Sequence, residues 1–134
     1  EIQPISIEKN KFTILIAEDN ESNYKLFASI LKGEYQLIHA WDGEEAVQLF
    51  KQHNPHLVLM DINMPKMDGY EATQKIREIS PDVPVMAITA FAYAEDEQHI
   101  LNSGFNAYTS KPIQAEQLQK QIGNLLKKHF LFLY

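Results

Sequence analysis

Acidic, hydroxyl and ammonium side chains follow four of the short apolar segments in this sequence. Glu18 and Asp19 come directly after the first apolar segment, and Asp61 comes directly after the third. Thr89 ends the fourth segment, and Lys111 follows the fifth. In-line phosphoryl transfer to a carboxylate requires a nucleophile, a metal ion, and cationic and hydroxyl partners for the phosphoryl oxygens. These five residues are therefore candidates for a phosphoryl-transfer site.

The three acids among these residues predict a metal site. Carboxylates that approach one another repel, and desolvation raises the cost unless a cation compensates their charge. Ligation by carboxylate oxygens selects a hard ion, so we expect Mg²⁺, with Mn²⁺ as the alternative. Any one of the acids could instead cap the helix that follows it. Lys111 alone could be a solvated surface lysine, and Thr89 alone an ordinary strand residue.

Strand-like apolar segments alternate with amphipathic, helix-like segments five times along the chain. The strands are predicted at 13–17, 35–40, 57–60, 85–89 and 107–110. This alternation indicates parallel strands joined by right-handed helical crossovers. We therefore expect an α/β fold of the flavodoxin-like, doubly wound (βα)5 type, with a five-stranded parallel sheet in the order 2-1-3-4-5. Ligands bind such sheets at the carboxyl ends of the strands, where the candidate residues stand.

The composition restricts the kinds of protein to consider. A length of 134 residues suits one compact domain, and the formal charge of −6 argues against nucleic-acid binding. The absence of cysteine excludes a disulfide framework and a thiolate metal site, and it fits a reducing compartment. No apolar run approaches the roughly 20 residues that span a bilayer. We therefore expect a cytoplasmic domain without membrane contact of its own.

Four short motifs make the sequence resemble the receiver domains of two-component signalling, over about residues 12–128. They are an acidic pair, an aspartate followed by Met-Pro and Met-Asp-Gly, a hydroxyl residue before alanine, and a lysine before proline. Each motif alone is weak, but all four in this order and at these spacings are highly specific. The residues that carry them are Glu18-Asp19, Asp61-Ile62-Asn63-Met64-Pro65 with Met67-Asp68-Gly69, Thr89-Ala90 and Lys111-Pro112.

The resemblance implies a phosphoacceptor domain of a phosphorelay, which catalyses only its own phosphorylation and dephosphorylation. It implies Asp61 as the nucleophile and Asp19 as the main ligand of a Mg²⁺ ion. Glu18 would bind the ion directly or through water, because its side chain is one methylene longer than the aspartate found in many family members. Asp61 itself and the backbone carbonyl of Asn63 would complete the protein's ligands.

The resemblance also implies which residues contact the phosphoryl group and which pass the resulting conformational change to the rest of the domain. Lys111 and Thr89 would bind the phosphoryl oxygens, and Tyr108 would turn inward when Thr89 moves toward them. This motion would switch the face formed by the fourth and fifth strands. Tyr108 could instead be an ordinary tyrosine half buried at the sheet edge. The peptide bond between Lys111 and Pro112 is expected to be cis.

A histidine kinase or a histidine phosphotransfer domain is the expected phosphodonor. The five histidines of this chain neither form a metal pattern nor resemble a phosphotransfer histidine, so we expect them at the surface. The stretches 20–23 and 101–108 resemble receivers fused to sensor histidine kinases. This favours the C-terminal receiver of a hybrid kinase, whose parent chain could be anchored in a membrane, over a stand-alone receiver. A weak dimer is a further option.

The ends of the chain are predicted to lie outside the receiver domain. Residues 1–11 have no strong periodicity and are interpreted as a linker, and 129–134 as an apolar C-terminal tail. If the last helix continues, Leu126, Phe130 and Leu133 fall on one stripe, which would pack on another chain, on the rest of a kinase or on a crystal neighbour. The alternative is a terminus that folds back over the first helix or is disordered.

Three other functions fit these residues less well than a phosphoacceptor domain does. A flavin or nucleotide binder would need a phosphate-binding loop after the first strand, where Glu18 and Asp19 would repel the phosphate. A phosphatase with an aspartate nucleophile would need a second aspartate two residues later, where this chain has Asn63. A phospho-independent docking module would not need every site position filled. The sequence therefore favours the phosphoacceptor over all three.

Overall fold

The computed structural model describes residues 12–90 and 94–130, within which five strands and five helices alternate. The strands are β1 (Thr13–Ala17), β2 (Gln36–Ala40), β3 (Leu57–Asp61), β4 (Val85–Thr89) and β5 (Ala107–Ser110). The helices are α1 (Glu21–Leu31), α2 (Gly43–His53), α3 (Gly69–Ile79), α4 (Ala94–Asn102) and α5 (Ala115–Phe130). Each strand is thus followed by one helix, as the alternating pattern predicts.

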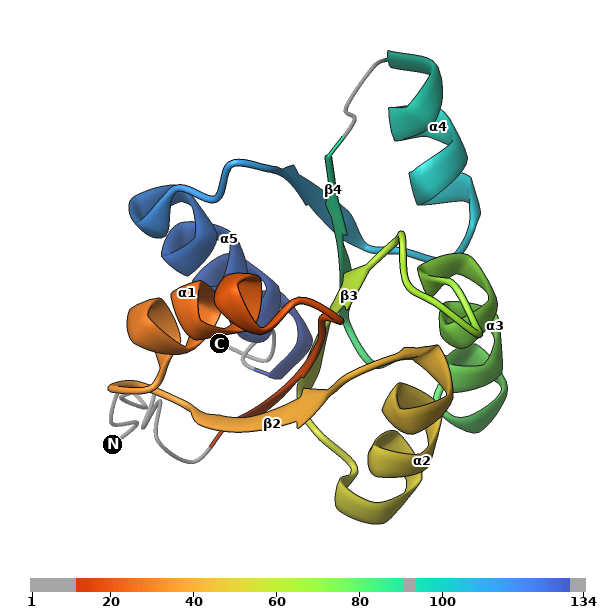
Figure 1. Cartoon of the computed structure of the whole chain (residues 1–134), viewed down its shortest axis with the longest axis horizontal. Helices are drawn as coiled ribbons and strands as arrows, with labels where there is room; N and C mark the ends of the chain where they lie inside the picture. Colours follow the sequence, from red (N-terminus) through yellow and green to blue (C-terminus); the bar gives the residue numbers. More distant parts are fainter. Residues whose placement is uncertain (1–11, 91–93, 131–134) are drawn as a thin grey trace, which may run out of the picture.

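All five strands pair in parallel, in the order β2-β1-β3-β4-β5 (Figure 1). This confirms the doubly wound, flavodoxin-like fold and the strand order predicted from the sequence. Every residue of β3 and β4 is buried, and β1 is buried except at its first residue. Their sequences are continuously apolar because helices cover both faces of the sheet.

The helices form two layers around the sheet. Figure 1 shows α1 and α5 on one side and α2, α3 and α4 on the other. Alternate residues of each central strand therefore join different cores. Leu15 and Val58 pack with residues of α2 and α3, whereas Ile14 and Leu57 pack with residues of α1 and α5. The central strands are thereby fixed from both sides, which gives their carboxyl ends a rigid position.

Three helices begin at polar residues that follow closely on a strand. The side chains of Asn20, Asp42 and Asp68 accept hydrogen bonds from backbone amides at the start of α1, α2 and α3. A cap of this kind stabilises a helix by about 1 kcal/mol. Because each cap stands only two to seven residues after the preceding strand, these helix starts lie at the carboxyl edge of the sheet.

The bounds of two strands differ from the predictions by one residue. Strand β2 begins at Gln36, one residue later than predicted, and β3 includes Asp61, whose backbone still pairs with Ile88 of β4. This pairing matters for the site, because it places the Asp61 backbone within the sheet instead of in a loop.

Helix α5 continues to Phe130, two residues beyond the receiver boundary predicted at 128. The Phe130 ring is exposed but contacts the rings of Phe12 and His56, while Leu126 is buried. Leu133, the third member of the predicted stripe, lies outside the described residues. No helix in the described part of the chain combines the length and the apolar character needed to cross a membrane.

Candidate phosphoryl-transfer site

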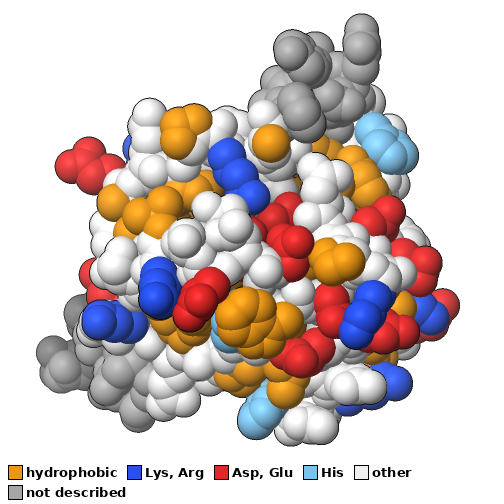
Figure 2. Space-filling view, in the orientation of Figure 1, with side chains coloured by type: hydrophobic (Ala, Val, Ile, Leu, Met, Phe, Trp, Pro, Cys, Tyr) orange, Lys and Arg blue, Asp and Glu red, His pale blue; other side chains and the backbone are white. Residues whose placement is uncertain are grey.

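Three carboxylates from two adjacent strands meet at the carboxyl edge of the sheet. One oxygen from each of Glu18, Asp19 and Asp61 lies within 4.8 Å of the others. Glu18 and Asp61 are buried, with 1% and 3% of their surface exposed, whereas Asp19 is exposed. The pairing of β1 with β3 brings these acids together although more than forty residues separate them in the chain. Figure 2 shows acidic side chains gathered near the centre of this face, beside a basic one.

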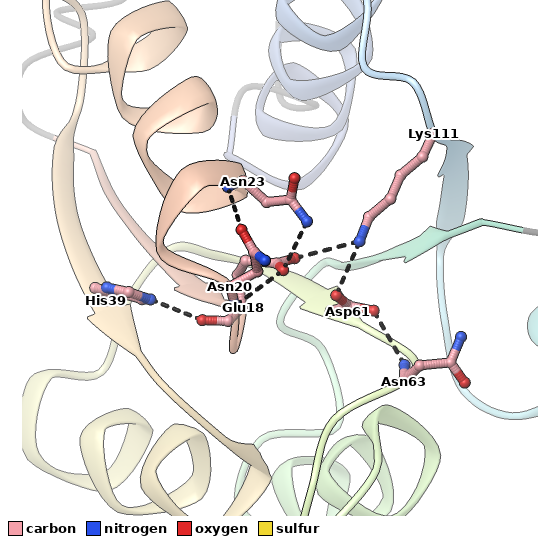
Figure 3. Close-up of polar contacts among 7 residues, drawn as sticks. All are labelled: Glu18, Asn20, Asn23, His39, Asp61, Asn63 and Lys111. Carbon is pink, nitrogen blue, oxygen red and sulfur yellow. Dashed lines mark hydrogen bonds and ion pairs between the residues drawn. The ribbon is translucent and has the colours of Figure 1, made fainter.

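Lys111 approaches two of these carboxylates from the end of β5. Its Nζ lies 3.1 Å from Oδ2 of Asp61 and 3.6 Å from Oε2 of Glu18 (Figure 3). Burial by itself would lower the pKa of Lys111, but the Asp61 and Glu18 carboxylates outweigh it and raise that pKa. Lys111 therefore stays charged at neutral pH and compensates part of the negative charge of the site.

Glu18 is held by the start of α1 through one of its two carboxylate oxygens. Oε1 accepts from the backbone amide of Asn20 at 3.3 Å and from Nδ2 of Asn23 at 3.1 Å. Oε2 accepts no hydrogen bond from the described residues and has only the ion pair with Lys111. Burial, and then the nearby Asp61 carboxylate, raise the pKa of Glu18 from 4.5 to about 7. The site is therefore short of positive charge.

The donor set of the site suits a hard divalent cation. Three carboxylates offer oxygen ligands, and among the described residues the buried Oε2 of Glu18 lacks the hydrogen bond that such an atom normally makes. A cation bound among these oxygens would favour the ionised form of Glu18, against the effect of burial. The residues present therefore fit a Mg²⁺ ion.

Asp61 is oriented by contacts with both of its oxygens. The backbone amide of Asn63 donates to Oδ1 at 3.0 Å, and Lys111 donates to Oδ2. Gly69, the first residue of α3, lies directly against the Asp61 backbone, where a Cβ atom would collide with the Asp61 carbonyl oxygen. These contacts fix both the side chain and the main chain of the candidate nucleophile.

The two predicted switch residues lie on β4 and β5. Thr89 is buried at the end of β4, and its carbonyl accepts from the Lys111 amide at 2.8 Å. Tyr108 is half buried and packs against the core on the side of α2, α3 and α4. Partial burial, and then the Glu97 carboxylate of α4, raise the pKa of Tyr108. Tyr108 thus links β5 to α4. The bond between Lys111 and Pro112 is cis, as the resemblance implies.

Two residues that contact Glu18 were not predicted from the sequence. Asn23 donates to the Glu18 side chain, and Nε2 of His39 lies 2.8 Å from the Glu18 carbonyl oxygen (Figure 3). Asn23 stands three residues after the cap Asn20, a spacing that places both near the strand end, so this contact could have been found. His39, His56 and His129 are half buried, so the expectation that all five histidines lie at the surface was wrong for these three.

Comparison with known proteins agrees with this geometry. Residues 14–123 match the family described as the response regulator receiver domain. The chain is 38% identical over 117 residues to the polar-differentiation response regulator DivK of Brucella ovis, an overlap of 85% of this chain and 95% of DivK. The chain therefore belongs to the response regulator receiver domain family of two-component signalling.

Solved structures support the same assignment. The receiver domain of the sensor histidine kinase PA1611 from Pseudomonas aeruginosa PAO1, with a magnesium ion coordinated in its active-site cleft, is 32% identical with a TM-score of 0.80. The overlap covers 86% of this chain and 97% of that one. The CheX–CheY–BeF3–Mg²⁺ complex from Borrelia burgdorferi contains a chain that is 30% identical, with a TM-score of 0.81 and coverage of 85% and 88%. Receiver domains bind Mg²⁺ in an acidic site of this kind.

Proposed function

We propose that Asp61 accepts a phosphoryl group from a phosphohistidine of a partner protein, in a reaction that depends on Mg²⁺. The observation that carries this proposal is the position of Asp61, which is buried between Lys111 and two further carboxylates at the end of β3. A buried carboxylate at this position destabilises the folded protein, because three acids and one lysine leave net negative charge. Its presence there therefore indicates a chemical role. The partner would be a histidine kinase or a histidine phosphotransfer domain.

The residues of the site have separate tasks in this reaction. An Asp61 carboxylate oxygen forms a bond to phosphorus while the bond between phosphorus and the imidazole nitrogen of the donor breaks. The imidazole leaves with the electron pair of that bond. The Asn63 amide holds Oδ1 of Asp61 in place, and Lys111 lies close enough to neutralise a phosphoryl oxygen as charge accumulates on it. The Thr89 hydroxyl is proposed to donate a hydrogen bond to another phosphoryl oxygen.

Asp19, Glu18 and Asp61 would hold the metal ion, with the backbone carbonyl of Asn63 as a further ligand. When bound, Mg²⁺ neutralises the negative charge that builds up on the phosphoryl oxygens. Asp19 would be the main ligand, since its carboxylate is exposed while Glu18 is already engaged by Asn23 and Lys111. Asp19→Asn should therefore weaken Mg²⁺ binding steeply in calorimetric titration, and Glu18→Gln should weaken it less.

Intact-mass spectrometry with a small phosphodonor such as acetyl phosphate tests the proposal directly. With Mg²⁺, the protein should gain one phosphoryl group, and peptide mapping should locate it on Asp61. Without Mg²⁺, or in Asp61→Asn, the added mass should be absent. Labelling of Asp61→Asn to the wild-type extent would overturn the assignment. Continuous release of phosphate from many donor molecules by each protein molecule would instead indicate a phosphatase.

We also propose that Thr89 and Tyr108 transmit phosphorylation to the face formed by β4, α4 and β5. The effect of the Glu97 carboxylate on the pKa of Tyr108 supports this role, because it relates β5, the strand directly before Lys111, to helix α4. Tyr108→Ala should still be labelled at Asp61, but phosphorylation should then change the NMR chemical shifts of α4 less than in the wild type. Unaltered shift changes in Tyr108→Ala would restrict Tyr108 to a structural role.

The domain limits and the parent protein are also proposals. We propose residues 12–128 as the receiver domain, with 1–11 as a linker and 129–134 as an apolar tail. The matched range of 14–123 lies inside these limits. The likeness to the receiver of a sensor histidine kinase supports the origin in a hybrid kinase, whereas the likeness to DivK supports a stand-alone receiver. Limited proteolysis should remove 1–11 first and leave the receiver intact.

A further inference from the structure

His39 donates a hydrogen bond to the backbone next to the metal ligands. Its Nε2 lies 2.8 Å from the carbonyl oxygen of Glu18. A carbonyl oxygen only accepts hydrogen bonds, so Nε2 must carry the proton. Glu18 stands one residue beyond β1, and its amide makes the last contact with β2 by donating to the Ala40 carbonyl. The chain then leaves β2 for the cap of α2, and the His39 side chain supplies the donor for the Glu18 carbonyl.

Two aromatic rings hold the His39 imidazole in this position. The Tyr24 ring, on α1, stacks on it with ring centroids 3.7 Å apart and planes at 1°. The Trp41 ring contacts it with centroids 4.1 Å apart and planes at 40°. Stacked rings restrict the rotation of the imidazole, so the direction of its N–H group is fixed. Tyr24 also follows Asn23 directly, so α1 holds both the Glu18 side chain, through Asn23, and the ring that orients His39.

The Glu18 carbonyl belongs to the peptide group that joins Glu18 to Asp19. A peptide group is planar, so a hydrogen bond that fixes its oxygen also restricts the direction in which the Asp19 backbone continues. Among the described residues, the Asp19 carboxylate makes no hydrogen bond or ion pair. Its position therefore depends on its backbone, unlike that of Glu18.

We propose that His39 is a positioning residue of the metal site, which acts through the Glu18–Asp19 peptide on the Asp19 carboxylate. This inference rests on the proposed function, in which Asp19 is the main metal ligand. Side chains that orient metal ligands typically affect metal affinity by 10–100-fold when they are replaced. Because His39 acts through one peptide group and not on a ligand atom, we expect an effect of about tenfold, at the lower end of that range.

Two substitutions of His39 separate the hydrogen bond from the ring stacking. His39→Phe keeps an aromatic ring between Tyr24 and Trp41 but has no N–H donor. It should weaken Mg²⁺ binding by about tenfold in calorimetric titration, with an unfolding midpoint of the Mg²⁺-free protein close to that of the wild type. His39→Gln retains an N–H donor, so it should bind Mg²⁺ within about threefold of the wild type even if it loses stability. His53→Phe, at an exposed position at the end of α2, is the matched control and should bind Mg²⁺ normally.

The tautomer of His39 can be measured without metal or phosphodonor. Long-range ¹H–¹⁵N NMR correlations of the Mg²⁺-free protein should show a proton on Nε2 of His39. A proton on Nδ1, or wild-type Mg²⁺ affinity in His39→Phe, would overturn the inference, as would an equal loss of affinity in His53→Phe. These measurements do not involve phosphorylation. If the wild type fails to be labelled at Asp61, the proposed function fails, whereas the role of His39 in Mg²⁺ binding is still decided by the titrations.

Discussion

The Nζ atom of Lys111 lies 3.1 Å from Oδ2 of Asp61, at the end of two strands that do not pair with each other. Strand β4 separates β3 from β5, so the lysine side chain reaches across the end of β4 to the acid (Figure 3). The same ammonium group is 3.6 Å from the carboxylate of Glu18, the residue directly after β1. One cation thus serves two buried carboxylates, and the site has an excess of negative charge.

Asp61→Asn should stabilise the Mg²⁺-free protein while it abolishes phosphorylation. The substitution keeps the shape of the side chain but removes one of the two buried carboxylates that share Lys111. Relief of this repulsion should raise the free energy of unfolding by about 1–2 kcal/mol. Urea denaturation in EDTA at pH 8 measures the change. A loss of stability would show that the Asp61–Lys111 ion pair outweighs the repulsion between Asp61 and Glu18.

The Mg²⁺-free protein should lose stability as the pH rises toward 8. The folded-state pKa of Glu18 is raised from 4.5 to about 7, so ionisation of Glu18 favours the unfolded chain. The contribution of Glu18 to the free energy of unfolding is full below pH 4.5 and is lost as the pH rises through about 7. Its magnitude is on the order of 2 kcal/mol. Denaturation in EDTA between pH 5.5 and 8 measures this slope.

Glu18→Gln is the variant that tests the source of that slope. It should be less sensitive to pH in this range than the wild type, because glutamine does not ionise. Glu116→Gln, which changes an exposed glutamate in the first turn of α5, should retain the wild-type slope. Addition of Mg²⁺ should stabilise the wild type most at the alkaline end, where Glu18 is ionised. Equal slopes in Glu18→Gln and the wild type would assign the effect to other groups.

His56 should make the stability of the folded protein depend on pH in the acid range as well, with a sign opposite to that of the Glu18 effect. Its Nδ1 accepts a hydrogen bond from the Thr13 amide at 3.0 Å, and burial lowers its pKa below 6.5. As the pH falls, His56 is therefore protonated in the unfolded chain at a higher pH than in the folded protein. Stability is lost as the pH falls from 6.5 toward the folded-state pKa. Asp82 and His129 line the same cavity and are the other titratable groups there.

His56→Asn tests this second dependence, because the amide oxygen of asparagine can accept from Thr13 without titrating. The variant should lose less stability between pH 6.5 and 5 than the wild type does. His53→Asn, at an exposed position on α2, is the control and should behave as the wild type. Thermal unfolding at fixed ionic strength gives the comparison, and identical acid slopes in all three proteins would contradict the assignment.

Two glycine substitutions should have opposite effects on stability. In Gly69→Ala the new methyl group would collide with the backbone of Asp61 and lie 2.8 Å from the Cα of Ile62. We expect a loss of about 2 kcal/mol or more, together with slower labelling of Asp61. In Gly123→Ala, on α5, the methyl group meets no atom within 4 Å, and the higher helix propensity of alanine should add about 0.5–1 kcal/mol. Urea denaturation of both variants tests the pair.

The fold and most of the site were predictable because their signals are local. The apolar runs that become β1, β3 and β4 are continuous because both faces of these strands are buried, and this is visible in the sequence. Parallel strands place their carboxyl ends at one edge of the sheet, so the polar residues after these runs had to lie near one another. The convergence of Glu18, Asp19 and Asp61 follows from this rule and is found in the structure.

The sequence alone thus determined the order of the elements, the edge of the sheet that carries the site and the residue types present there. The tertiary structure decided which of those residues touch. The contact of His39 with Glu18 spans 21 positions and depends on the register between β1 and β2, which no local pattern reports. The burial that raises the pKa of Glu18, and that leaves its Oε2 without a hydrogen bond from the described residues, likewise arises only when β1, β3 and α1 come together. Periodicity records which face of an element is buried, whereas distances, hydrogen bonds and pKa values depend on the neighbours that the fold brings to that face.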